Sequence, residues 1–159
     1  MSGRPAPEIV TAEWLNASEQ PTLESLRGRV VFLCAFQMLC PGCVAQALPQ
    51  AQRVHETFAA HDVSVVGLHS VFEHHEANSR AALEAFLHEY RLTFPVAIDA
   101  PSVDGPIPRT MAAYAMQGTP TLILVGRDGT VRKQKFGHET DLRLRAEIMS
   151  LVLEPQLLG

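Results

Sequence analysis

Continuous apolar runs alternate along this chain with segments in which apolar residues recur every three or four positions. The runs at 30–36 and 63–69 predict strands that are buried on both faces of a parallel sheet. Between them, from Pro41 to Phe58, apolar residues recur at helical spacing, although Pro49 should kink that helix. A strand, a helix and a strand of these lengths predict a βαβ unit with a right-handed crossover.

The rest of the pattern predicts shorter elements. Apolar residues at helical spacing predict helices at 82–90 and 144–152, and a short helix to about Met116 is expected after the Pro/Gly-rich loop at 101–108. Shorter apolar runs predict strands at 9–15, 94–98, 121–125 and 130–136. The last two strands flank Asp128-Gly129, a dipeptide typical of a hairpin turn. The order is therefore βαβ, then αβα, then ββα, preceded by an edge strand.

The composition fits one globular domain over residues 1–159, because 47% of the residues are hydrophobic and 19% are charged. The net charge of −4 excludes the basic surface expected of a nucleic-acid-binding protein. No stretch approaches the roughly 18 apolar residues of a membrane-spanning helix, and the first residues lack the apolar core of a signal peptide. We expect no nucleic-acid partner, no membrane segment and a cytoplasmic location for the chain as given, or a periplasmic one if a leader was removed.

The motif Cys40-Pro41-Gly42-Cys43 lies where a predicted strand meets a predicted helix. Residues three apart in a helix are neighbours, so the two cysteines are close enough for a disulfide that can form and open again. Free N–H groups and the helix dipole favour a thiolate at Cys40, which is therefore expected to attack disulfides. Cys43, one turn further along, is expected to resolve the mixed disulfide.

A pair of cysteines at this spacing can also be half of a zinc site. Tetrahedral zinc needs four ligands, and the sequence has no second CxxC, although seven histidines are present. Cys34 falls within a predicted strand and is expected to be a buried apolar residue. A CxxC within a βαβ unit favours redox chemistry. We expect no bound metal and no cofactor beyond the redox-active disulfide.

A second group of candidate residues follows the strand at 63–69. His69 ends that strand, and ligands of open α/β sheets gather at the carboxyl ends of strands. Imidazole and carboxylate groups accept protons, so His69, Glu73 and Glu76 are candidates for proton transfer near the cysteines. The alternatives are a hydrated polar loop or, together with the thiolates, a copper or zinc site.

These features together resemble the thioredoxin superfamily. The resemblance rests on the CxxC after a buried strand, on Thr119-Pro120 before the hairpin, and on the order of the elements. The segments Phe94-Pro95-Val96 and Ala6-Pro7-Glu8 are similar to those of TlpA/ResA-like thiol-disulfide oxidoreductases and of related redoxins of the AhpC/TSA type. The resemblance implies an α/β, thioredoxin-like fold, a three-layer α/β/α sandwich with an αβα insert and an N-terminal extension.

The resemblance also implies roles for single residues. Cys40 would be the attacking cysteine and Cys43 the resolving one. Pro120 would be a cis proline packed beside the disulfide, and Thr119 would offer its backbone to an extended substrate. The implied function is thiol-disulfide exchange or disulfide reduction. The partners would be a protein or small-molecule disulfide and an upstream thiol reductant.

Several departures from the family pattern bear on function. Leu39 stands where the family often has tryptophan, and Asn78 stands where ResA-like proteins carry a glutamate near the disulfide. Leu39 and Pro41 flank the cysteine pair and are candidate substrate contacts. The main alternative is a peroxiredoxin-like thiol peroxidase, whose Pro-x-x-x-Thr-x-x-Cys signature is absent because Gln37 stands three residues before Cys40. A further alternative is a non-enzymatic metal-binding protein with this fold.

Overall fold

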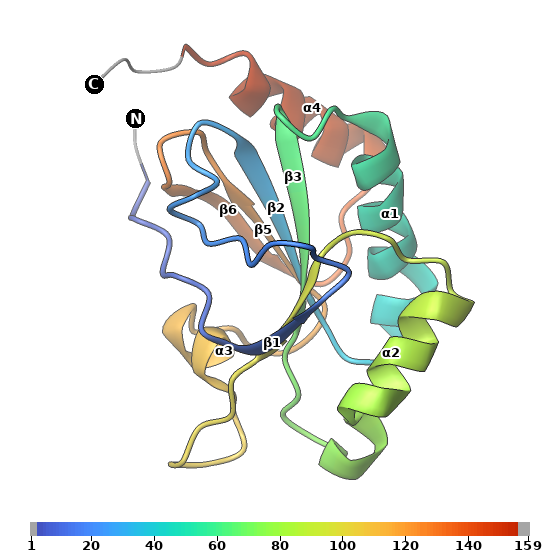
Figure 1. Cartoon of the computed structure of the whole chain (residues 1–159). Coiled ribbons are helices and arrows are strands. Elements are labelled where there is room, and N and C mark those ends of the chain that lie inside the picture. The colour runs from blue at the N-terminus through green and yellow to red at the C-terminus, as the bar shows by residue number, and fades with distance from the viewer. Residues whose placement is uncertain (1–2, 156–159) are drawn as a thin grey trace.

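The computed structural model describes residues 3–155, which fold around a six-stranded sheet with the order β1-β4-β3-β2-β5-β6 (Figure 1). The strands are β1 (Thr11–Leu15), β2 (Val30–Phe36), β3 (Val63–His69), β4 (Val96–Asp99), β5 (Thr121–Val125) and β6 (Val131–Phe136). The α-helices are α1 (Leu48–Thr57), α2 (Arg80–Glu89), α3 (Arg109–Ala113) and α4 (Asp141–Val152). The expectation of a single domain over 1–159 extends beyond the described residues at both ends and stays a prediction.

The centre of the sheet is parallel and its edges are antiparallel. β2 pairs with β3, and β3 with β4, in parallel register, so that Phe36 lies opposite His69. β1 adds to β4, β5 adds to β2 and β6 adds to β5, all antiparallel. The carboxyl ends of β2, β3 and β4 therefore lie at one edge of the sheet, where the segments that follow them can meet.

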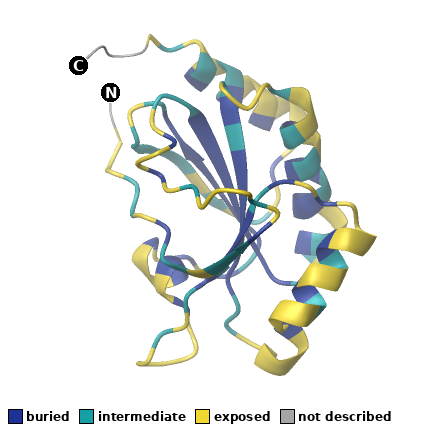
Figure 2. Cartoon of the chain, viewed as in Figure 1, coloured by how far each residue is buried: buried dark blue, intermediate teal, exposed yellow. Residues whose placement is uncertain are grey.

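Helices cover both faces of the sheet, which gives three layers (Figures 1 and 2). One core cluster packs Phe32, Cys34 and Phe36 of β2 against α1, α2 and α4. The other cluster packs the alternate residues of β2, such as Leu33, against α3 and the 22–28 segment, which includes Leu26. All seven residues of β2 are buried, which explains why that strand is an uninterrupted apolar run.

The helix after the cysteines differs from the one predicted. It begins at residue 41, but Cys43–Ala47 form a π-helical segment before α1. The N–H of Leu48 donates to the carbonyl of Cys43, and Pro49, which has no N–H, follows directly. The irregularity expected at Pro49 therefore takes the form of a wider turn ahead of it.

Three strands also start later than predicted: β1 at Thr11 rather than residue 9, β4 at Val96 rather than residue 94, and β6 at Val131 rather than residue 130. Pro95 accounts for the second difference, because proline has no N–H to donate to a ladder. Ile9 and Phe94, which precede β1 and β4, are nevertheless both buried.

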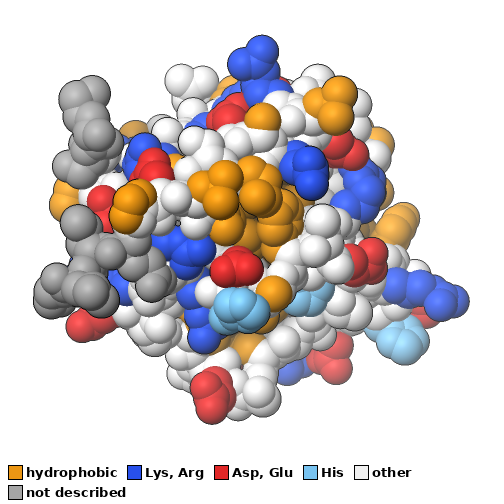
Figure 3. Space-filling view, turned by 90° about the horizontal axis from the view of Figure 1, so that it is seen from above, with side chains coloured by type: hydrophobic (Ala, Val, Ile, Leu, Met, Phe, Trp, Pro, Cys, Tyr) orange, Lys and Arg blue, Asp and Glu red, His pale blue; other side chains and the backbone are white. Residues whose placement is uncertain are grey.

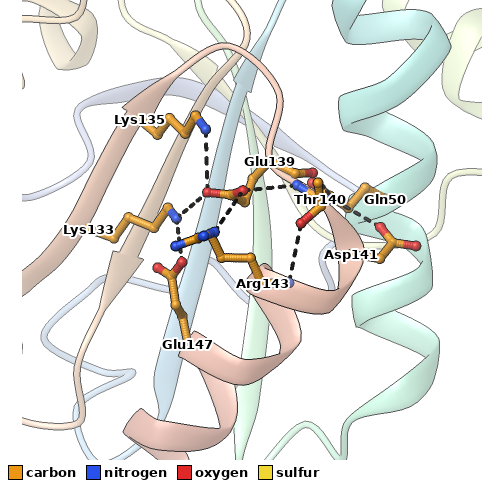
Figure 4. Close-up of polar contacts among 8 residues, drawn as sticks. All are labelled: Gln50, Lys133, Lys135, Glu139, Thr140, Asp141, Arg143 and Glu147. Carbon is orange, nitrogen blue, oxygen red and sulfur yellow. Dashed lines mark hydrogen bonds and ion pairs between the residues drawn. The ribbon is translucent and has the colours of Figure 1, made fainter.

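A buried carboxylate joins the end of the hairpin to two helices (Figure 4). Glu139 accepts a hydrogen bond from Nζ of Lys133 at 2.7 Å, and its backbone carbonyl accepts one from the buried Gln50 of α1 at 2.7 Å. The bond from Lys133 lowers the pKa of Glu139 to about 2. This cluster fixes the segment after β6, in which the N–H of Gly137 donates to the carbonyl of Pro120 at 2.9 Å.

Figure 3 shows the end of the molecule that is uppermost in Figure 1, at the other end of β2 from the cysteine pair. Hydrophobic side chains gather near the centre of this face, and basic, acidic and histidine side chains surround them. Within the described residues, no helix has both the length and the apolar character that crossing a membrane requires.

Candidate active site

Cys40 lies at the start of the helix that follows β2. Its carbonyl accepts the N–H of Val44 at 3.1 Å, which makes Cys40 the residue that caps the helix. The N–H of Cys43 points at Sγ of Cys40, with a nitrogen–sulfur distance of 3.3 Å. Because Cys40 is partly exposed, an incoming sulfur atom can reach Sγ, and the N–H of Cys43 is placed to stabilise a negative charge there.

Cys43 lies behind Cys40 and is buried. Burial raises the pKa of the Cys43 thiol, and a hydrogen bond with the sulfur of Cys40 acts in the same direction. A backbone hydrogen bond from Gln37 opposes this effect. Both cysteines are free thiols in the structure, and the raised pKa keeps the Cys43 thiol protonated at neutral pH.

Cys34 is fully buried within β2, as predicted. Burial raises its pKa to about 12, so its thiol stays neutral at physiological pH. It belongs to the same core cluster as Cys43, but as a packing residue.

Thr119 and Pro120 lie directly beside the cysteine pair. The thiol of Cys40 donates to the carbonyl of Thr119 at 3.3 Å, and the Thr119–Pro120 peptide bond is cis. A Cβ atom added to Gly42 would lie 3.5 Å from Cδ of Pro120, so the proline ring runs alongside the CxxC motif. The structure thus brings together residues separated by about eighty positions in the sequence.

Exposed apolar side chains flank Cys40. Leu39 is 60% exposed, and Pro41 is also exposed. Phe136, at the end of β6, is 53% exposed, and its ring lies 3.1 Å from the position that a Cβ atom of Gly118 would take. Sequence reasoning did not identify Phe136. The signal was an aromatic residue ending an otherwise polar edge strand, next to the segment that leads into Thr119.

His69 lies close to the active-site loop, where it contacts Asn78 and Phe36. Its Nε2 is 3.3 Å from Oδ1 of Asn78, and its ring packs on Phe36 with centroids 5.2 Å apart. Burial lowers the pKa of His69 to about 4, so the imidazole is neutral at physiological pH. Within residues 3–155, no hydrogen bond joins His69 to Cys40 or Cys43.

Glu73 and Glu76 are exposed in the segment between β3 and α2. Neither carboxylate makes a hydrogen bond to a cysteine within the described part of the chain. This segment contacts the active-site loop through its backbone: the N–H of Glu73 donates to the side chain of Gln37 at 3.3 Å. Within the described residues, none of the three candidates for proton transfer is joined to a cysteine by a hydrogen bond, and their role stays a prediction.

Two amide side chains form contacts that the sequence did not reveal. Gln37 is buried, and its Oε1 accepts hydrogen bonds from the backbone of the β3–α2 segment. Asn78 is buried as well, and its Oδ1 accepts the N–H of Met38 at 3.1 Å. The hints in the sequence were that Gln37 directly follows a buried strand and that Asn78 stands where ResA-like proteins carry a glutamate near the disulfide. The partner of each amide is 35 to 40 residues away.

A metal site is not visible in the described region. Across residues 3–155, no three His, Cys, Asp or Glu side chains are grouped in a way that could hold an ion. The chemistry that the site offers is that of two sulfur atoms, one accessible and one buried behind it.

Comparison with known proteins identifies the family. Residues 2–134 match the AhpC/TSA family. Thiol-disulfide oxidoreductase ResA of Bacillus anthracis is 24% identical over 149 residues, which cover 94% of this chain and 78% of the relative. The crystal structure of a thioredoxin-like superfamily protein has 50% identity and a TM-score of 0.93, with 96% of this chain and 99% of that chain covered.

The crystal structure of a thiol-disulfide isomerase from Corynebacterium glutamicum has 44% identity and a TM-score of 0.91, covering 95% of this chain and 97% of that chain. These likenesses confirm the predicted thioredoxin-like α/β fold. The chain therefore belongs to the AhpC/TSA family, as a redoxin of the thioredoxin superfamily that is similar to TlpA and ResA.

Proposed function

We propose that this protein is a thiol-disulfide oxidoreductase whose redox centre is the Cys40–Cys43 pair. One observation carries the proposal: Cys40 is partly exposed, its sulfur receives the N–H of Cys43 and lies 3.3 Å from the Thr119 carbonyl, and the Cys43 thiol is buried. This arrangement provides one nucleophile for the substrate and one internal thiol to release it. Relatives that are named for thiol-disulfide oxidoreduction and isomerisation support the assignment.

The reaction needs two exchange steps. The Cys40 thiolate attacks one sulfur of the substrate disulfide, the S–S bond breaks, and the other sulfur leaves with the electron pair and takes up a proton. Cys43 then loses its proton and attacks Sγ of Cys40, which releases the second substrate thiol and leaves a Cys40–Cys43 disulfide. Two electrons pass to the substrate, and an upstream dithiol returns them. Run backwards, the same steps oxidise a dithiol, and in neither direction is a cofactor needed beyond the disulfide itself.

The substrate class follows from what surrounds the accessible sulfur. Leu39, Pro41 and Phe136 supply exposed apolar surface, and Thr119 supplies a backbone carbonyl beside Cys40. A cysteine within an extended apolar polypeptide segment fits this surface better than a small charged disulfide does. The reaction suits either compartment considered above, the cytoplasm or the periplasm, provided that an upstream thiol reductant is present.

The test is dithiothreitol-driven reduction of insulin, with Cys40→Ser and Cys43→Ser variants, followed by equilibration of the protein with glutathione. Wild-type protein should reduce insulin, and both variants should lose catalytic turnover. If Cys43→Ser keeps full turnover, the two-cysteine mechanism is wrong. A faster reaction with a hydroperoxide than with any disulfide would instead establish the peroxidase alternative.

A further inference from the structure

The loop that carries Cys40 is joined to the β3–α2 segment by two neutral amide side chains that reach in opposite directions. Gln37 reaches from the active-site loop to the backbone of Phe72 and Glu73. Asn78 reaches from the end of the β3–α2 segment to the backbone of Met38. We call these two side chains, Gln37 and Asn78, the amide clamp.

Within the amide clamp, Gln37 is the residue whose backbone forms hydrogen bonds with both cysteines. Its carbonyl accepts the N–H of Cys40 at 3.4 Å, which closes the turn leading to the helix. Its backbone also forms the hydrogen bond that favours the thiolate of Cys43. The position of the Gln37 backbone therefore sets where each sulfur lies relative to the other.

The side chain of Gln37 holds that backbone in place. Only 3% of the residue is exposed, and Oε1 accepts two backbone hydrogen bonds, from Phe72 at 3.0 Å and from Glu73 at 3.3 Å. A carbonyl oxygen has two lone pairs, so this acceptor is fully used. Removing it would leave two backbone donors without their partner, which is unfavourable wherever the donor stays buried.

Asn78 completes the clamp from the other side. Its Oδ1 accepts the N–H of Met38 and lies 3.3 Å from Nε2 of His69, while its Nδ2 donates to the carbonyl of His74 at 3.1 Å. The orientation of the amide is therefore determined by a donor and an acceptor at once. Asn78 thus ties the active-site loop to the end of β3 and to the turn that precedes α2.

We propose that the amide clamp positions the two cysteines for reaction, with Gln37 and Asn78 as positioning residues that never touch the substrate. This inference rests on the proposed function, since it concerns how the same cysteine pair is tuned. Without the clamp, the turn from Gln37 to Cys40 is free to shift relative to Thr119 and to the N–H of Cys43. Both the reactivity of Cys40 and the equilibrium between dithiol and disulfide should change as a result.

The experiment compares Gln37→Met with Gln52→Met. Methionine keeps the length of the side chain and removes the carbonyl oxygen. Gln52 is a matched control outside the amide clamp, because its side-chain amide also binds a loop. It accepts the N–H of Thr93 at 3.0 Å and donates to the Thr93 hydroxyl at 2.9 Å. The measurements are the rate of Cys40 alkylation by iodoacetamide, the equilibrium constant with glutathione, and the midpoint of urea unfolding.

We expect Gln37→Met to slow alkylation at least fivefold and to shift the glutathione equilibrium constant at least threefold. Gln52→Met should leave both within twofold of wild type. Asn78→Ala should act in the same direction as Gln37→Met, and it serves as the deciding variant if Gln37→Met does not fold. The urea midpoints show whether a change in reactivity merely follows lost stability.

The inference is overturned if folded Gln37→Met, or Asn78→Ala in its place, matches wild type in both measurements. It is also overturned if Gln52→Met changes them as much as the clamp variants do. Failure of the proposed function has a different signature, because wild-type protein would then neither reduce insulin nor equilibrate with glutathione. Alkylation of Cys40 would still report on the clamp in that case.

Discussion

The thiol of Cys40 donates a hydrogen bond to the carbonyl oxygen of Thr119 across 3.3 Å. This bond exists only while the thiol keeps its proton, because a thiolate has nothing to donate. Loss of the proton therefore frees the Thr119 carbonyl at the same moment that it creates the nucleophile. A substrate backbone N–H can then take the place of the thiol as the donor to that carbonyl. Sulfur chemistry and backbone recognition are thus coupled at one oxygen atom.

The order of attack can be tested by trapping the mixed disulfide. Cys43→Ser should accumulate an adduct with a disulfide-containing peptide, linked through Cys40, because the resolving thiol is missing. Cys40→Ser should trap little, since Cys43 is buried and its raised pKa keeps it protonated. Mass spectrometry of the peptide-treated variants gives the adduct and its position.

Cys34→Ala is the control for this experiment, because it removes the third thiol, which lies in the core of β2. It should trap no more adduct than wild type and should reduce insulin normally, at a cost in stability of about 1 kcal/mol for the small cavity. An adduct that collects on Cys43 in the Cys40→Ser protein would reverse the two roles.

The exposed Leu39 should contribute to substrate binding. Leu39→Ser removes apolar surface next to Cys40, so KM for a peptide disulfide with apolar residues around its cysteine should rise about threefold to tenfold, equivalent to roughly 0.7–1.4 kcal/mol. The alkylation rate of Cys40 should stay within twofold, because iodoacetamide does not use that surface. Steady-state kinetics with the peptide give KM and kcat separately.

Leu142→Ser is a matched control, since Leu142 is 85% exposed on α4, away from the cysteines. Equal effects of the two substitutions on KM, or no effect of Leu39→Ser, would remove Leu39 from the substrate surface.

His69 should make stability depend on pH. Its pKa is about 4 in the folded protein and about 6.5 when unfolded, so between these values the unfolded chain binds more protons. The free energy of unfolding should therefore rise with pH from 4 to 6.5, and this single group accounts for about 3 kcal/mol of the rise. In His69→Gln, the slope of the free energy of unfolding against pH should be smaller over that window, because about one proton fewer is taken up on unfolding.

Urea unfolding at several pH values between 4 and 7 measures this slope. His75→Gln provides the matched control, because His75 is an exposed histidine a few residues further along the chain. Glu139, with its pKa lowered to about 2, adds a further loss of stability only below about pH 4.5, and this loss is common to all three proteins. A His69→Gln slope equal to that of wild type would show that His69 is not the group responsible.

Gly67 in the centre of β3 should not tolerate a side chain. A Cβ atom there would lie 2.7 Å from the ring of Phe94 and 3.3 Å from that of Phe36. Gly67→Ala should therefore lower the free energy of unfolding by about 1–3 kcal/mol through overpacking. Gly105→Ala, where a Cβ atom would meet nothing within 4 Å, should change it by less than about 0.5 kcal/mol. Similar unfolding midpoints for the two variants would contradict this packing argument.

The parts of the fold that could be predicted are those in which one physical effect dominates. β2 and β3 have the bounds that their apolar runs predict, because strands buried on both faces need apolar side chains throughout. Cys40 and Thr119 were paired through a resemblance, since nothing in their local sequences says that they meet. The contacts of Gln37 and Asn78 were not predictable, because a hydrogen bond between distant segments leaves no periodic pattern.

The exposed edge of the sheet bears on how this protein avoids aggregation. β6 is the outermost strand beyond β5, so part of its backbone is open to pairing with any extended chain. Its sequence contains Arg132, Lys133 and Lys135, and charged side chains, lysine in particular, discourage such edge-to-edge addition. Extended polypeptides, the substrates proposed above, would bring unpaired backbone to this edge continually. The three charged side chains of β6, each paired with a glutamate, would discourage those chains from adding to the sheet. Phe136, at the end of the strand and next to Gly118, would remain as an exposed apolar side chain.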